Sequence, residues 1–463
     1  MTSPRQQADA HHALPARRVS ATLAPDISSS TASLSAHRPG IRPLSLRTNF
    51  AWTLPANLAY AACHWGILVV LAKVGSSELV GLYVLGLSIT APVFVCASLQ
   101  LRAIQATDAQ SEYGFADYLA LRLVSTLAAL LLASTIAWLV GHRDTALWAV
   151  VLVAVAKSAE SFSDVIYGLL QQRERMDRVA QSKACHGLAL LVGVGGGALA
   201  TGSIVGAAGG LVVARLLVLL GCDIPAAVWV TGETGSWIRR TCKLLRPRFD
   251  ARQLLGLCSM GLPLAIVTLL VSLEMNIPQY FVTHHLGLAE LGVFGAVAAL
   301  ITAGGMFTRA MNQVASPRLA AMHHAGDSQG FRRLLARMLA AYLVLGGLGL
   351  AVVPVIGRWL LVTLFRSEFG DHVDLLLVVM LAAAVAYLSG ALTTAMIALR
   401  AISSQLPLRL LTAATSLVIC LLLVPEHGLY GAGWALVCAK IPFVLAALVI
   451  VWRKTRAAVE GGC

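Results

Sequence analysis

The chain has few charged residues for its length. Of its 463 residues, 12% are Asp, Glu, Lys or Arg and 58% are hydrophobic, and this charged fraction is about half of that found in soluble domains. A water-soluble fold of this size would lack the charge to cover its surface. The hydrophobic residues also come in runs of about 20 or more, the length of a helix that crosses a bilayer. The composition therefore predicts an all-α, polytopic membrane protein and argues against a soluble enzyme.

The sequence also lacks the spacings that hold metals or cofactors. Its nine cysteines are scattered, and none forms a CxxC pair or a Cys/His ligand pattern. Isolated cysteines of this kind are typical small core residues. We therefore expect no metal, no cofactor and no catalytic group.

The first 48 residues differ from all that follows. They are rich in Ser, Ala, Pro and Arg and show no hydrophobic period, which predicts a disordered tail. No hydrophobic segment followed by a cleavage site occurs there, so we do not expect a secretory signal peptide. We interpret residues 1–48 as a cytoplasmic tail.

Twelve hydrophobic segments follow the tail. They predict transmembrane helices at about 50–72, 79–101, 118–140, 145–170, 181–201, 204–230, 254–281, 287–311, 334–356, 373–398, 405–424 and 429–452. The predicted organisation is an N-terminal six-helix bundle (49–231), a basic cytoplasmic linker (232–253), a C-terminal six-helix bundle (254–453) and a C-terminal tail (454–463). The connecting loops are too short to hold a separate folded domain.

The net charge of +13 does not indicate nucleic-acid binding, because the cations follow the loops. The tail and every second connection carry 28 of the 35 Lys and Arg residues. The opposite side carries four, which are Lys73, Arg143, Arg358 and Arg366. Lys and Arg are enriched on the cytoplasmic side of membrane proteins. This distribution predicts that both termini are cytoplasmic.

The two predicted halves resemble each other. Gly75–Leu79 and Gly287–Leu291 occupy equivalent loops, and Pro55 matches Pro263 in the first helix of each half. In the sixth helix of each half, Ala214-Arg215 recurs as Ala439-Lys440. Parallel repeats of this kind are a transporter architecture with a central cleft between two bundles.

Three charges fall on one face of the predicted helix 145–170. Lys157, Glu160 and Asp164 share a narrow arc with Ser161 and Gly168 at helical spacing. Charges at bilayer depth are costly and usually face the bundle interior. The stripe either lines a cavity or neutralises itself, with Glu160 pairing to Lys157 and sharing a proton with Asp164. We expect Glu160 and Asp164 to act in gating or ion coupling if the stripe lines a cavity.

Arg215 and Lys440 lie near the middle of the membrane at equivalent positions of the repeat. Two central cations suit an anionic head group such as a phosphate, and we expect Lys157 and Arg102 to contribute to the same substrate site. Alternatively, each central cation forms a structural ion pair with Glu160 or Asp164.

Glu274 is a further acidic residue within a predicted helix. It lies near the outer end of helix 254–281, before Pro278. It is a candidate for a gate or a proton site, and alternatively it caps a helix break at the proline.

Several short motifs resemble those of a known transporter family. They are Phe50-Ala51-Trp52-Thr53, Gly81-Leu82-Tyr83, Ala91-Pro92-Val93-Phe94, Leu99-Gln100-Leu101-Arg102, Asp117-Tyr118-Leu119 with Arg122, Glu160-Ser161 with Asp164, Tyr167-Gly168 and Glu174-Arg175-Met176. With twelve helices in two halves, this series resembles the Wzx-like flippases of the MOP (multidrug/oligosaccharidyl-lipid/polysaccharide) exporter superfamily. The resemblance covers about residues 46–455.

The resemblance implies an inner-membrane flippase that moves polyprenyl-pyrophosphate-linked saccharides by alternating access, with glycosyltransferases and a polymerase as possible partners. The charges in the predicted membrane segments are mixed, so a strongly cationic cleft does not follow from the sequence. A multidrug antiporter of the same superfamily remains an alternative because of Glu160 and Asp164. A membrane-bound polysaccharide polymerase or ligase is a weaker alternative, because the outer loop 357–372 is small for a catalytic site.

Overall fold

The computed structural model describes residues 46–108, 112–232, 235–401 and 404–460. All of these lie in one unit that begins at Pro43. The first 45 residues of the predicted tail lie outside the described residues, and the first helix begins at Leu46, slightly before the predicted boundary. The other predicted domain boundaries stay a prediction.

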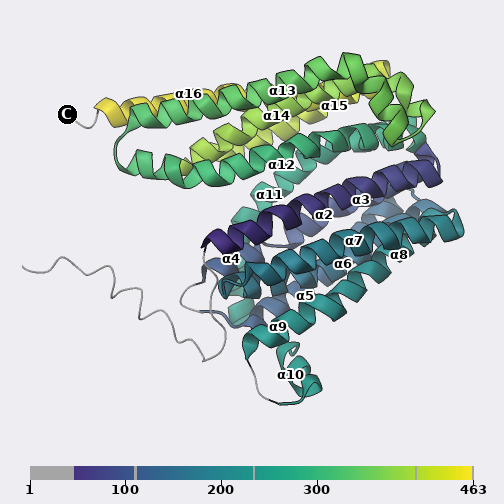
Figure 1. Cartoon of the computed structure of the whole chain (residues 1–463), viewed down its shortest axis with the longest axis vertical. Coiled ribbons are helices and arrows are strands. Elements are labelled where there is room, and N and C mark those ends of the chain that lie inside the picture. Colours follow the sequence, from purple (N-terminus) through teal and green to yellow (C-terminus); the bar gives the residue numbers. More distant parts are fainter. Residues whose placement is uncertain (1–45, 109–111, 233–234, 402–403, 461–463) are drawn as a thin grey trace, which may run out of the picture. The chain divides into compact units, whose positions relative to one another are not determined.

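The first half of the chain forms six helical segments, whose arrangement can be followed in Figure 1. Their elements are α2 (Leu46–Val74), α3 (Ser77–Ala97) with α4 (Leu101–Thr107), α5 (Phe115–Leu139), α6 (Asp144–Gln172), α7 (Met176–Thr201), and α8 (Ile204–Val218) with the π-helix η1 (Leu219–Asp223) and α9 (Ile224–Thr231). A short helix, α10 (Trp237–Leu244), follows within the basic segment predicted as a linker.

The second half forms the other six helical segments. Their elements are α11 (Ala251–Leu286), α12 (Leu288–His324), α13 (Ser328–Leu364), α14 (Val373–Ala398) after the 3₁₀ turn η2 (Ser367–His372), α15 (Gln405–Cys438) and α16 (Lys440–Glu460). Gly428 has φ 57° and ψ −130°, a non-helical conformation that divides α15. The last two helical segments are therefore 405–427 and 429–460, close to the predicted 405–424 and 429–452.

The helices have the length and composition of membrane spans. Ten runs in the described part of the chain are long and apolar enough to cross a membrane, and the last of them, Gln405–Arg456, contains the break at Gly428. The 29 residues of α6 add one more helix of spanning length. The described residues thus hold twelve spanning helices, and the predicted all-α, polytopic membrane fold is confirmed.

Two predictions about helix breaks are wrong. The predicted helix 79–101 is interrupted, because Leu99 and Gln100 adopt left-handed φ values of 48° and 50° between α3 and α4. Such conformations are strained for residues with a side chain, and this turn redirects the chain so that α4 packs on α6. In contrast, α11 continues through Pro278 to Leu286, so Glu274 does not cap a break there.

Glycines bring helices into backbone contact at two places. In α7 and α8, a Cβ on Gly193 or Gly197 would overlap the backbone oxygen of Gly210 or Gly206, respectively. Small residues spaced four apart allow this close approach between membrane helices. The second contact joins the two halves of the chain, where a Cβ on Gly81 of α3 would overlap the backbone of α12.

Candidate substrate-binding site

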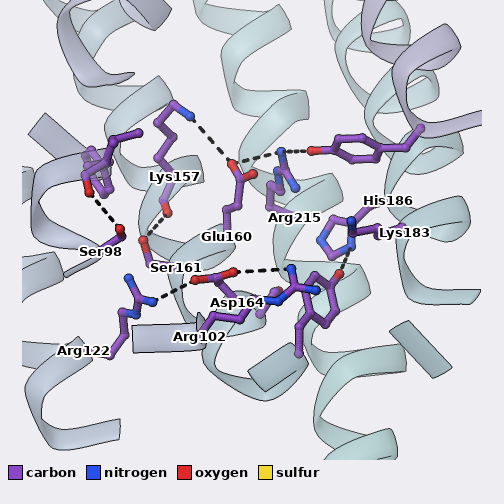
Figure 2. A pocket seen from close by; sticks show the side chains of 15 residues that line it. Ser98, Arg102, Arg122, Lys157, Glu160, Ser161, Asp164, Lys183, His186 and Arg215 are labelled. Atoms are coloured by element: carbon purple, nitrogen blue, oxygen red, sulfur yellow. Dashed lines mark hydrogen bonds and ion pairs between the residues drawn. The ribbon is translucent and has the colours of Figure 1, made fainter. Parts of the chain in front are cut away.

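The charged stripe of α6 lines a cavity of about 290 Å³. Every predicted member except Gly168 faces it, which are Lys157, Glu160, Ser161 and Asp164, and further walls come from α2, α3, α4, α5, α7 and α8. Gly168 lies where a Cβ would overlap the side chain of Gln105 of α4. The stripe therefore faces a cavity within the first bundle (Figure 2).

Glu160 binds two cations in this cavity. Its Oε2 lies 3.1 Å from Arg215 Nη2 and 3.8 Å from Lys157 Nζ. Arg215 also donates a hydrogen bond of 3.1 Å to the hydroxyl of Tyr60 on α2. Arg215 is buried while the Glu160 side chain is 38% exposed, so the pair lies at the cavity wall with the carboxylate facing the open space.

Asp164 also binds two cations. Its Oδ2 lies 2.8 Å from Arg122 Nη2, and its Oδ1 lies 3.7 Å from Arg102 Nη1. Arg102 reaches Asp164 from α4, and its guanidinium also lies over the ring of Tyr167. The shared proton between Glu160 and Asp164 is therefore wrong, because each carboxylate has its own pair of cations (Figure 2).

The cavity carries a net positive charge. Its described lining includes two carboxylates, Glu160 and Asp164, and five cationic side chains, Arg102, Arg122, Lys157, Lys183 and Arg215. With histidine neutral, the difference is +3. The mixed charge expected from the sequence becomes a cationic cavity once the helices are assembled.

Two of the predicted site residues lie elsewhere. Lys440 and Glu274 bond to each other in the second bundle, and neither lines the charged cavity. Arg409 completes their cluster, with Nη1 at 3.3 Å from Glu274 Oε2. The expectation that Arg215 and Lys440 face one shared cleft is thus wrong for this conformation, because each has its own carboxylate partner in its own bundle.

The second cluster is closed off from solvent. The side chain of Glu274 is 2% exposed. Arg409 also donates a hydrogen bond of 3.1 Å to Thr393 Oγ1 and lies over the ring of Phe443. The cluster thus holds one carboxylate and two cations, all largely buried.

Sequence reasoning did not single out three of these cations, because it counted them with the cations of the cytoplasmic side. Arg122 and Arg409 lie in helices and are buried, and Lys183 lines the cavity and donates a hydrogen bond of 2.8 Å to Asn57. Arg122 and Arg409 each lie inside a predicted helix, about one turn from its start. Their position within the helices could have indicated a buried role, because a long cationic side chain one turn inside a helix can extend into the bundle.

A buried polar network backs the cavity. Tyr167 shares hydrogen bonds with Ser182 at 2.7 Å and with His186 Nδ1 at 3.2 Å, and Ser182 donates to Asp223. Asp223 ends the π-helix η1 and is fully buried. π-helical turns of this kind are frequent at functional sites. The network holds the walls of the cavity formed by α6 and α7 in place.

The comparisons with known proteins give one related sequence and several similar structures. No model of a protein family matches the chain. The chain is 24% identical over 387 residues to the "Capsular polysaccharide biosynthesis protein CapF" of Staphylococcus aureus, which covers 83% of this chain and 93% of that protein.

The similar structures are transporters. An inward-facing multidrug resistance MATE family transporter of the MOP superfamily has a TM-score of 0.69 at 13% identity, covering 89% of this chain and 96% of that one. An outward-facing transporter of the same description has a TM-score of 0.60 at 14% identity, with 89% and 95% covered.

A third similar structure is a MOP superfamily transporter from Pyrococcus furiosus. Its TM-score is 0.60 at 14% identity, with 89% of this chain and 96% of that one covered, and it is described as having a binding pocket of reversed polarity that suggests a different function. The twelve spanning helices in two bundles form the same architecture as these matched structures. The chain is a multi-pass membrane protein with the transporter fold of the MOP superfamily.

Proposed function

We propose that this protein is a flippase that moves polyprenyl-pyrophosphate-linked saccharides across the inner membrane during surface polysaccharide synthesis. The observation that carries the proposal is the cavity of net charge +3 within the first bundle. A pyrophosphate is a compact anion that several guanidinium and ammonium groups bind well together. The related capsular polysaccharide protein supports the saccharide part of the proposal.

The cavity has the geometry to receive an anion. Arg102 is 26% exposed and its closest carboxylate contact, to Asp164, is long at 3.7 Å. Lys157 is similarly placed, 3.8 Å from Glu160. Arg102 also donates a hydrogen bond of 3.3 Å to Gln171, but both cations can turn toward a phosphate by giving up only long contacts to a carboxylate. Arg122 and Arg215, in contrast, are buried and held by closer carboxylate partners.

Alternating access fits the conformation of the chain. Its fold is more similar to the inward-facing transporter than to the outward-facing one, with TM-scores of 0.69 and 0.60. In the proposed orientation, the charged cavity in this form receives its head group from the cytoplasmic side.

A multidrug antiporter is the second candidate. The matched transporters of the same fold favour it. Against it, a cavity with three excess positive charges repels the cationic compounds that an acidic cleft would attract. A polymerase or ligase has less support, since the matches are to transporter folds.

We expect Arg102→Ala to weaken binding of an anionic substrate while the protein still folds. Asp164 keeps Arg122 at 2.8 Å in this variant, so no carboxylate is left without a cation. Loss of one charge-assisted contact costs about 1.5–3 kcal/mol, or about tenfold or more in affinity. Binding of geranyl pyrophosphate to the purified protein, measured by calorimetry, checks the expectation.

The matched control is Arg358→Ala. Arg358 lies outside the cavity with a 77% exposed side chain, so its removal takes the same charge from the surface and should leave affinity within about twofold. Equal binding by the wild type and the Arg102 variant, together with tight binding of a cationic dye, would favour the antiporter instead.

We also propose that both termini and the segment around α10 are cytoplasmic. Reporter fusions at Arg248, which is 66% exposed, and after Arg453 should then be active only with a reporter that works in the cytoplasm. The expectation rests on the excess of Lys and Arg in alternate connections. Activity of a periplasmic reporter at either site would contradict the orientation and the inner-facing role of the cavity.

A further inference from the structure

A second cavity lies between the two bundles and differs in character from the first. It has a volume of about 800 Å³ and is lined by α3 and α5 of the first bundle and α11 of the second. None of its described lining residues is Lys, Arg, Asp or Glu. We call it the interbundle groove.

Three hydroxyl groups that line the interbundle groove are bonded to backbone oxygens, that of Thr283 to Gln279 at 2.7 Å, and two histidines, His142 and His284, also line it. The hydroxyl of Tyr280 donates a hydrogen bond of 2.6 Å to the backbone oxygen of Ser88, and Ser125 donates to the backbone oxygen of Arg122 at 3.3 Å. The remaining surface is largely aliphatic, for example Val93, Leu132 and Leu273. A ligand of this groove therefore gains affinity by burying hydrocarbon.

The groove is long. On α3 it extends from Leu85 to Ala97, which at the helical rise corresponds to about 18 Å. On α5 it extends from Ser125 past the end of the helix to His142. A space with this extent along the helices fits a chain that lies parallel to the lipid tails.

The groove adjoins the charged cavity. The end of α3 separates them, with Val95 and Ser98 facing the charged cavity and Cys96 and Ala97 facing the groove. On α5, Arg122 lines the charged cavity and Ser125, one turn later, lines the groove. Both spaces therefore meet at the same ends of α3 and α5.

We infer that the interbundle groove binds the isoprenoid chain of the substrate whose pyrophosphate occupies the charged cavity. The inference rests on the proposed function and adds a second binding site to it. An amphiphile with a compact anionic head and a long hydrocarbon chain matches a cationic cavity that adjoins a long apolar groove. Because α11 forms one wall, the chain-binding site would change whenever the bundles move relative to each other.

The test compares two ligands that share a head group. The wild type in detergent should bind a polyprenyl pyrophosphate of undecaprenyl length much more tightly than geranyl pyrophosphate, because each buried methylene adds affinity. Ala128→Trp should reduce this gain, since Ala128 is exposed and lines the groove. We expect about a tenfold loss for the long ligand and less than about a twofold change for the short one.

Leu131→Trp is the matched control. Leu131 is on the same helix and 60% exposed, but it does not line the groove. This variant should therefore bind the long pyrophosphate as much more tightly than the short one as the wild type does. Unchanged geranyl pyrophosphate binding by Ala128→Trp shows that the variant has folded.

Three results would overturn the inference. A chain-length gain that survives Ala128→Trp places the isoprenoid elsewhere, and equal losses in both tryptophan variants mean that the effect is not local. Competition by phosphatidylglycerol as strong as by the long pyrophosphate makes the groove a membrane-lipid site. In contrast, failure of the wild type to bind either pyrophosphate would refute the proposed function itself.

Discussion

Replacing Glu274 with alanine should unfold the second bundle or bring it close to unfolding. The substitution leaves Lys440 and Arg409 buried, with side-chain exposures of 12% and 11%, and Glu274 is the one described carboxylate paired with either of them. Breaking a buried ion pair by removing one partner costs about 3–5 kcal/mol, since the remaining charge is uncompensated. The measurement is the thermal midpoint of the purified protein, with its amount in the membrane as a second readout.

The control for this variant is Asp371→Ala. Asp371 pairs with Arg358 at 3.8 Å, but both side chains are more than three-quarters exposed, so its removal should cost less than about 1 kcal/mol. Exchanging the charges, with Glu274→Lys and Lys440→Glu together, should recover part of the stability lost by Glu274→Ala. If Glu274→Ala is as stable as the wild type but does not transport, Glu274 acts as a gate or proton site and not as a structural acid.

The second large effect is expected at the crossing of α3 and α12. A Cβ on Gly292 would overlap the backbone oxygen of Ser77, and one on Gly81 would overlap that of Leu288. Backbone atoms cannot move aside as a side-chain end can, so Gly292→Ala must push the two helices apart. Overpacking of this kind costs about 1–3 kcal/mol.

This crossing links the two bundles near the loops predicted to face outward, so separating it should also disturb transport. We expect Gly292→Ala to lower both the thermal midpoint and the rate of substrate movement in reconstituted vesicles. Gly347→Ala is the control, because Gly347 has open space around its Cβ position and helix interiors gain about 0.5–1 kcal/mol from this change. Normal stability and transport in Gly292→Ala would mean that the crossing is looser in the membrane than in the structure.

The helices themselves could be predicted closely from the sequence. The length of the hydrophobic runs placed all twelve, and residues 373–398 were predicted with the bounds observed for α14. The spacing of Lys157, Glu160 and Asp164 also predicted a shared face. These properties are local, because a membrane helix satisfies its own backbone and its side-chain directions follow from the helical repeat.

The partners of the charges could not be predicted in the same way. Arg215 was expected to share a cleft with Lys440, yet it pairs with Glu160 while Lys440 pairs with Glu274. Arg102 was expected at the substrate site and Arg122 was not, yet both reach Asp164. The left-handed turn at Leu99 and Gln100 directs α4 and Arg102 toward α6. Neither residue is a glycine, so the sequence carries no signal for this turn.

The sequence by itself thus determined the membrane class, the twelve helices and the polar face of α6. The tertiary structure alone decided that the cavity is cationic, that Glu274 belongs to a separate buried cluster, and that an apolar groove adjoins the charged site. The physical reason is that ion pairs form between helices far apart in the chain. Their formation depends on helix rotation, tilt and depth. These are set by packing at contacts such as Gly81 with Gly292, and no local sequence pattern encodes them.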